Sequence, residues 1–289
     1  MFRYILLPAT GDETDPPVFH TALTLARAWA GHLAFLHVRL DVQQLILTVS
    51  AGDFAGGAGV GELVDKLQLD SEAQQERARQ AVQAFCAAEH LPLSAGPADG
   101  VPSAEWQSST GEEARELALR GRAADIVVLG RARTGEAVAL DVLEAVLLDS
   151  GRPLLIAAPT APTAPIGRRI VIAWKDTAEA ARAVADARPL ISRAEAVTIV
   201  AVEEDATTSA ASCERLRQAL AWHNPAVCVR HVQPGATEPV DVLLAELTSL
   251  GADLLVMGGY SHRRVHEMVF GGFTRRVLEA AHLPVMMAH

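Results

Sequence analysis

Short apolar runs alternate with segments of helical periodicity along the whole chain. Residues 5–9 form an apolar run, residues 22–27 carry apolar side chains three and four positions apart, and residues 33–38 form a second run. Runs of this length are typical of buried strands, and the spacing between them is typical of an amphipathic helix. Their alternation predicts right-handed βαβ units, and therefore a parallel sheet with helices on both faces.

The same order of segments occurs a second time. Residues 170–174 and 197–202 form apolar runs in the second half of the chain, and residues 180–185 show the helical spacing between them. The halves match most closely further on, where Asp-Ile-Val-Val-Leu-Gly at 125–130 corresponds to Asp-Leu-Leu-Val-Met-Gly at 253–258. The chain is therefore predicted to be a duplicated domain, with a repeat far longer than that of a solenoid.

Each half also has a helical pattern before this matched strand and an apolar closing strand at its end, at residues 113–119, 240–250, 153–156 and 284–287. Each half is long enough to bury its own core, because domains cluster near about 100 to 150 residues. We predict the α/β class, with two tandem, open, doubly wound domains that each contain a five-stranded parallel sheet.

Prolines mark the boundary between the halves. Residues 159–165 contain three prolines and no large apolar side chain, so this stretch fits neither a helix interior nor a central strand. We predict a first domain over residues 1–158, a linker over 159–167 and a second domain over 168–289.

The first domain is longer in its middle, and most of the excess falls at residues 41–75. This stretch combines a glycine-rich segment, 52–61, with a polar helical pattern that begins at Glu62. We predict an insertion here. Two interpretations remain open, a lid over a ligand site and a surface excursion without function, because long loops are often either functional or disordered.

Composition and charge narrow the classes of function. Apolar residues make up 50% of the chain and charged residues 21%, a composition that indicates a folded globular protein. The net charge of −10 disfavours nucleic acid and anionic membranes as partners. Residues 1–7 lack the apolar core of a signal peptide, and no apolar run reaches the roughly 18 residues of a membrane span. The cysteines show no CxxC spacing, so we expect reduced thiols and a cytoplasmic protein: Cys86, Cys213 and Cys228.

The segment best suited to bind a ligand follows the matched strand of the second half. Gly258 ends this strand at the carboxyl edge of the predicted sheet, where open α/β folds bind ligands. Gly271 and Gly272 precede a helical run at 274–281. Their amides can approach phosphate oxygens, and the positive end of the helix favours an anion, although a glycine pair alone also fits a plain turn. Nearby arginines add positive charge: Arg263, Arg264 and Arg275.

Two stretches of the second half resemble the universal stress protein family. They read IVIAWKDTAEAAR at residues 170–182 and VMGGYSHRRVHEMVFGGFTR at residues 256–275. The resemblance covers nearly the whole chain, is strongest over 170–289, and is greatest to the tandem two-domain bacterial members. It implies the adenine-nucleotide α-hydrolase-like fold. ATP-binding members of the family carry a loop of glycine, two residues, glycine, nine residues, glycine, and then serine or threonine.

The spacing is kept, but three residues depart from the family pattern. Ser261 stands in place of the second glycine, and Gly272 stands in place of the final serine or threonine, with Thr274 two positions further on. Lys175 stands where family members place an aspartate at the end of the first strand. A lysine can meet a phosphate but cannot accept hydrogen bonds as a carboxylate does. The resemblance implies a site for ATP or AMP in the second domain, formed by Ala173, Lys175, Val202, Met257, Gly258, Ser261, Gly271, Gly272, Phe273 and Thr274.

The first half departs further from the family pattern. Thr10 takes the place of the strand-end aspartate, and the stretch after Gly130 lacks three residues and a glycine pair. Glu136 and Asp141 add negative charge there, so we expect no nucleotide in this half. The resemblance implies that the first half is a pairing partner whose closing strand meets that of the second half, in an intramolecular pseudo-dimer. It also allows a homodimer.

Two further residue groups have competing interpretations. His262 and His266 lie four positions apart, which suits a zinc site on one helix face, but solvent-facing histidines are favoured and we predict no metal. Trp174 is interpreted as a core aromatic, with stacking on a base as the alternative.

The function that these observations favour is that of a noncatalytic, cytoplasmic stress-response protein whose second domain binds an adenine nucleotide. A pure interaction module with vestigial sites is the first alternative, supported by the departures at Lys175, Ser261 and Gly272. A slow ATPase is the second alternative, although the loop offers no evident general base and the chain has no GxxxxGK[ST] motif.

Overall fold

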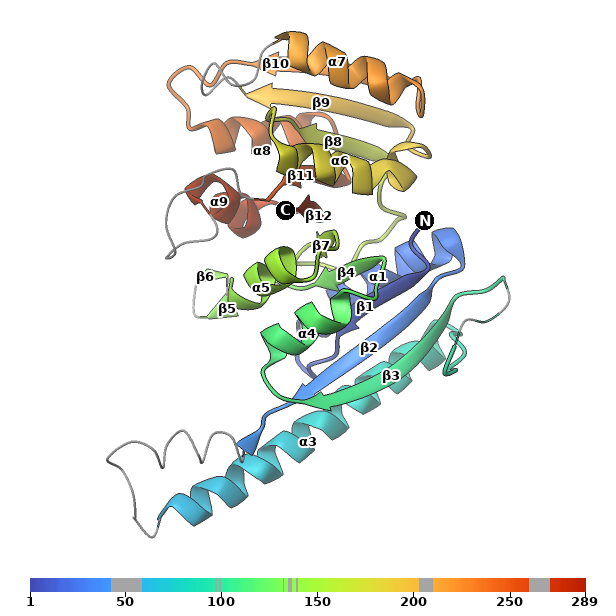
Figure 1. Cartoon of the computed structure of the whole chain (residues 1–289), viewed down its shortest axis with the longest axis vertical. Coiled ribbons are helices and arrows are strands. Elements are labelled where there is room, and N and C mark those ends of the chain that lie inside the picture. Colours follow the sequence, from blue (N-terminus) through green and yellow to red (C-terminus); the bar gives the residue numbers. More distant parts are fainter. Residues whose placement is uncertain are drawn as a thin grey trace.

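The computed structural model describes residues 1–42, 59–96, 98, 100–131, 133–134, 137–138, 140–202, 210–259 and 271–289 (Figure 1). The first half contains, in chain order, β1 (Tyr4–Pro8), α1 (Asp15–Trp29), β2 (His32–Arg39), α3 (Gly59–Ala88), β3 (Ser103–Thr110), α4 (Glu113–Gly121), β4 (Ile126–Leu129), β5 (Arg133–Thr134), β6 (Ala137–Val138), α5 (Asp141–Asp149) and β7 (Leu154–Ile156). The second half contains β8 (Arg169–Ala173), α6 (Ala178–Ile191), β9 (Ala196–Val202), α7 (Ala210–Ala221), β10 (Val227–Val232), α8 (Pro239–Ser249), β11 (Leu254–Gly258), α9 (Gly272–Ala280) and β12 (Val285–Ala288).

Each half forms a five-stranded parallel sheet, as predicted. The strand order is β3-β2-β1-β4-β7 in the first half and β10-β9-β8-β11-β12 in the second, so the same doubly wound topology occurs twice. The predicted linker, residues 159–167, lies between β7 and β8.

The closing strands of the two halves pair with each other. β7 and β12 run antiparallel, with Leu155 opposite Met286, and this pairing merges the two sheets into one sheet of ten strands (Figure 1). The predicted contact between closing strands is therefore confirmed, and the pseudo-dimer has a continuous main-chain joint.

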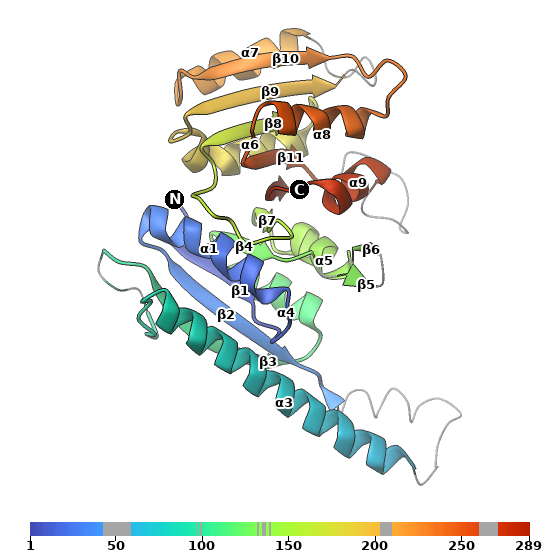
Figure 2. The ribbon, with the colours of Figure 1, turned by 180° about the vertical axis from the view of Figure 1, so that it is seen from behind.

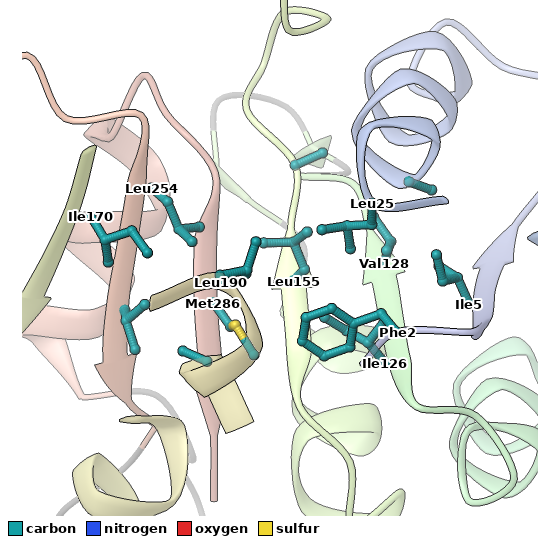
Figure 3. Packing of buried hydrophobic residues seen from close by; sticks show 14 of the residues in the cluster. Phe2, Ile5, Leu25, Ile126, Val128, Leu155, Ile170, Leu190, Leu254 and Met286 are labelled. Atoms are coloured by element: carbon teal, nitrogen blue, oxygen red, sulfur yellow. The ribbon is translucent and has the colours of Figure 1, made fainter. Parts of the chain in front are cut away.

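Apolar side chains alternate between the two faces of this sheet. Ile5 and Leu7 point into a core that includes α1, α3, α6 and α7, whereas Leu6 points into a second core with α4, α5, α8 and α9. Because a strand directs successive side chains to opposite faces, a strand buried on both faces must be apolar throughout. Both cores cross the joint, and Figure 3 shows Leu155 and Met286 within the first of them.

The described part of the predicted insertion is the start of one long helix. α3 has 30 residues, runs along β2 and β3, and extends past their ends (Figure 2). The polar helix expected from Glu62 is therefore present, continuous with the helix that covers the sheet. The interpretation of residues 41–75 as a lid stays a prediction, because residues 43–58 lie outside the described part of the chain.

None of the helices in the described ranges combines the length and the apolarity needed to cross a bilayer.

Candidate functional site

The carboxyl ends of neighbouring strands bring several predicted site residues to one edge of the second half. Ala173 ends β8, Val202 ends β9 and Gly258 ends β11. β8 lies between β9 and β11, and Met257 pairs with Ala173 across the ladder. The fold therefore places these four residues as the resemblance implies, at the edge where open α/β sheets bind ligands.

The amino terminus of α9 opens at the same edge, because the helix follows β11. Gly271 is the N-cap and Gly272 the first helical residue, and both are exposed. Among the described residues, no side chain caps this terminus and no atom lies within 4 Å of the position of a Cβ on either glycine. Gly271 has a φ of −64°, which any residue adopts, so its backbone conformation does not require glycine. A helix start of this kind, with backbone N–H groups that no described side chain caps, has the chemistry that suits a phosphate group.

The next two residues of α9 turn toward the protein. Phe273 packs against the core that contains α8 and α9, and Thr274 is buried. These side chains fix the first turn of the helix, so their part in an anion site would come through their main-chain amides.

Packing explains the two glycines at the end of β11. A Cβ on Gly258 would lie 2.6 Å from the backbone nitrogen of Ala180 in α6, and a Cβ on Gly259 would lie 2.6 Å from Cδ2 of Leu147 in α5. Real Cβ contacts are longer than this. Gly258 faces backbone atoms and so requires glycine for steric reasons, whereas a Cβ on Gly259 would force the ends of flexible side chains to shift. Gly258 thus serves the fold whether or not a ligand binds.

Lys175 and Trp174 follow β8 and differ in environment. Lys175 is half-buried near the strand end, whereas Trp174 is 9% exposed and its indole Nε1 donates to Ser212 Oγ at 2.9 Å. Trp174 is therefore a core aromatic between β8 and α7, as the favoured interpretation held. Thr177 then caps α6 by accepting a hydrogen bond from the amide of Ala180.

The middle of the predicted loop, residues 260–270, lies outside the described part of the chain. This segment includes Ser261, the arginines at 263 and 264, and the pair His262 and His266, so their roles stay predictions. Arg275, beyond the loop, is half-exposed and forms an ion pair with Glu279 at 3.1 Å. Within the described ranges, no group of three or more His, Cys, Asp or Glu side chains is arranged to hold a metal.

The corresponding edge of the first half is closed by its own side chains. The Asp15 carboxylate accepts hydrogen bonds from the Thr10 amide and hydroxyl, at 3.0 and 2.8 Å, and from the Gly11 amide at 2.8 Å. α3 lies directly over this turn, since a Cβ on Gly11 would be 2.9 Å from the backbone nitrogen of Ala78. Sequence reasoning singled out Thr10 but missed Asp15, which is the first residue of α1 and meets the turn only through the fold of residues 10–15.

The helix of the first half that corresponds to α9 is α5, and its first turn is negatively charged, whereas that of α9 has no acidic residue. α5 begins at Asp141 and carries Glu144 in its first turn, and a short antiparallel hairpin of β5 and β6 precedes it. Carboxylates at a helix amino terminus occupy the region of positive potential that an anionic ligand would use. This arrangement agrees with the expectation that the first half binds no nucleotide.

The fold and the two strand edges define an open, doubly wound α/β protein of two similar halves. The helix after the matched strand starts with the glycine pair Gly271 and Gly272 in the second half, and with the acidic residues Asp141 and Glu144 in its first turn in the first half. Residues 167–289 match the model of the universal stress protein family, so the second half of the chain is similar to that family.

Solved structures extend this similarity to the whole chain. A universal stress protein from Archaeoglobus fulgidus superposes with a TM-score of 0.69 at 18% identity, covering 99% of this chain and 96% of that one. A Pseudomonas aeruginosa protein assigned to the universal stress proteins superposes with a TM-score of 0.57 at 13% identity, covering 99% and 92%. At these identities the similarity establishes the fold. No curated protein matches the sequence.

Proposed function

We propose that the second half binds an adenine nucleotide, ATP or AMP, and that the chain is a noncatalytic stress-response protein of the cytoplasm. The observation that carries the proposal is the open, uncapped start of α9 at Gly271 and Gly272, on the carboxyl edge of the sheet. The family match of residues 167–289 supports it. The free state of the three cysteines agrees with a reducing compartment.

The chemistry of this edge suits a phosphate chain joined to a nucleoside. The first turn of a helix has backbone N–H groups without intrahelical partners, and the helix dipole adds partial positive charge there. Lys175, after β8, would add a full positive charge near the phosphates. Ala173 and Val202, half-buried at their strand ends, would face the less polar part of the ligand.

Calorimetric titration of the full chain with ATP and with AMP tests the proposal. We expect binding by the wild type and its loss in Gly271→Asp and Gly272→Asp, because a carboxylate at these positions repels phosphate and takes up the same amides. An aspartate at a helix start favours the helix, so these variants should keep their fold.

Gly61→Asp is the matched control. Gly61 lies in the first turn of α3, and the position of its Cβ is equally open. This variant carries the same substitution in the other half and should bind as the wild type does. Undetectable binding by the wild type at millimolar nucleotide, or unchanged binding by both loop variants, would overturn the proposal.

A pure interaction module is the second candidate. Lys175 and Ser261 depart from the family pattern, and the Thr10 turn of the first half is already closed by Asp15. Mass spectrometry of the purified, denatured protein separates the two functions, since a nucleotide-binding chain should release a copurified nucleotide. Phosphate release from ATP that is lost on changing Gly271 would instead identify an ATPase.

A further inference from the structure

A side chain from the first half holds the far end of the helix that starts at the proposed site. Arg131 directly follows Gly130 after β4, and its guanidinium reaches the last turn of α9. Nη1 donates to the carbonyls of Leu278, at 3.1 Å, and Ala281, and Nη2 donates to the carbonyl of Leu283 at 2.7 Å.

These three carbonyls lie in and just after the end of α9, where main-chain oxygens lack intrahelical donors. A guanidinium satisfies several of them at once with its planar set of donors, and its charge complements the negative end of the helix dipole. Burial lowers the pKa of Arg131 to about 10, which leaves it charged at neutral pH. Arg131 is thus a C-terminal cap that the first half supplies to a helix of the second.

The first half also contacts the other flank of the loop. Gly259 is the last described residue before residue 260, and the side chain of Leu147 in α5 lies so close that a Cβ on Gly259 would force it to shift. β6 of the first half lies against α9 as well. Both described flanks of the loop, Gly259 and α9, therefore rest on residues of the first half.

We infer that the first half is a platform for the ligand site of the second, and that Arg131 is the residue that positions α9 within that site. The inference rests on the proposed function. A helix of nine residues is a rigid rod about 13 Å long, so a tilt at its anchored end displaces Gly271 and Gly272 at the other end. Arg131 occupies the position at which a ligand loop would begin in the first half, and there it holds α9 instead.

Three variants of the full chain test this role. Arg131→Met removes the donors and keeps much of the side-chain length, and Arg131→Lys keeps the charge but offers a compact donor group in place of the planar fork. The matched control is Arg193→Met. Arg193 also joins the halves at a helix end, donating to the carbonyl of Ala28 at 2.7 Å and lying 5.3 Å from the Trp29 ring centre, but it touches α1.

Two readouts are needed for each variant, the affinity for ATP by calorimetry and the hydrogen exchange of the α9 amides without nucleotide. We expect Arg131→Met to weaken ATP binding about tenfold, within the usual range of coupling between sites, and to speed exchange in α9. Arg131→Lys should recover part of the affinity. Arg193→Met should change neither readout, and a purely structural role for Arg131 would lower stability and leave the affinity of the folded protein intact.

Unchanged affinity in Arg131→Met, or an equal loss in Arg193→Met, would overturn the inference. If Arg131→Met does not fold, the comparison of Arg131→Lys with the wild type decides in the same way. If the wild type does not bind ATP, the proposed function is overturned, and the positioning role with it. Faster hydrogen exchange in Arg131→Met that is confined to α9 would still show that Arg131 anchors this helix.

Discussion

The carboxylate of Asp253 accepts a hydrogen bond from the backbone amide of Arg169, and the amide nitrogen lies 3.2 Å from each carboxylate oxygen. Asp253 precedes β11 and Arg169 begins β8, so the contact ties the starts of two neighbouring strands. The first half repeats it, since Asp125 Oδ2 accepts from the amides of Arg3 and Tyr4 at 2.6 and 3.0 Å. The repeated aspartate in the sequence thus has a structural role at the amino ends of the strands in each half, opposite the carboxyl edge.

Removal of either carboxylate should destabilise the protein. Asp253→Ala and Asp125→Ala each leave amides without their acceptors, and we expect the free energy of unfolding to fall by about 1 to 3 kcal/mol. Urea denaturation monitored by circular dichroism measures the change. Asp70→Ala, at an exposed position of α3, is the control and should stay within about 0.5 kcal/mol of the wild type. Losses no larger than in that control would contradict the assigned role.

Two glycines of the candidate site should differ in how much their replacement by alanine lowers stability. Gly258→Ala forces a Cβ to within 2.6 Å of the Ala180 backbone, and we expect a loss of about 1 to 3 kcal/mol in stability. Gly271→Ala meets open space at an ordinary φ and should leave stability within about 0.5 kcal/mol of the wild type. Thermal unfolding of the two variants checks this contrast. A stable Gly258→Ala would show that α6 can move away from β11.

The Asp15 turn should make stability depend on acid pH. Burial raises the pKa of the Asp15 carboxyl above its ordinary value of 3.8, against the opposing effect of hydrogen bonds from Thr10 and Gly11. The folded state therefore binds this proton more tightly than the unfolded state. The contribution of Asp15 is then greatest below pH 3.8 and declines as the pH rises through the raised value.

Asp15→Asn does not titrate, so it isolates this contribution. We expect the difference in free energy of unfolding between the wild type and Asp15→Asn to shrink as the pH is raised from about 3 to about 6. Urea titrations at several pH values measure it. A difference that grows over this range would mean that the hydrogen bonds outweigh burial and lower the pKa.

The joint between the halves should couple their unfolding. Leu155 and Met286 are fully buried opposite each other in β7 and β12, and Leu155→Ala should cost about 2 to 5 kcal/mol. Calorimetry of the wild type should show one cooperative transition, because both cores cross the joint. Leu148→Ala, at an exposed position of α5, is the control. Two separate transitions in the wild type would show that the halves unfold independently.

The buried strands were predictable from the sequence, and the edge strands were not. β1, β4, β8 and β11 lie inside the sheet, so both faces are covered and their apolar runs are continuous. β3 and β10 lie at its two ends and are partly exposed, and polar residues interrupt both sequences, SAEWQSST and VCVRHV. Neither contains a continuous apolar run or a sustained alternation, and neither strand was specified beforehand.

The candidate site divides in the same way. Gly258, Gly271 and Gly272 were identified because a strand end and a helix start follow from local pattern. Arg131 could not be identified, because its partners at residues 278–283 are distant in sequence and come close only when the two sheets join. The close approach of Gly259 to the Leu147 side chain of the other half was hidden for the same reason.

The joining of β7 to β12 within one chain has a consequence for how the two halves can diverge. Separate subunits associate by mass action, so they dissociate on dilution unless their affinity for each other is maintained. A short tether such as residues 157–168 holds the partners at a local concentration in the millimolar range, whatever the amount of protein present. In such a chain the first half can lose its ligand loop, and Arg131 can support the second half instead. The two halves stay paired even when the protein is diluted.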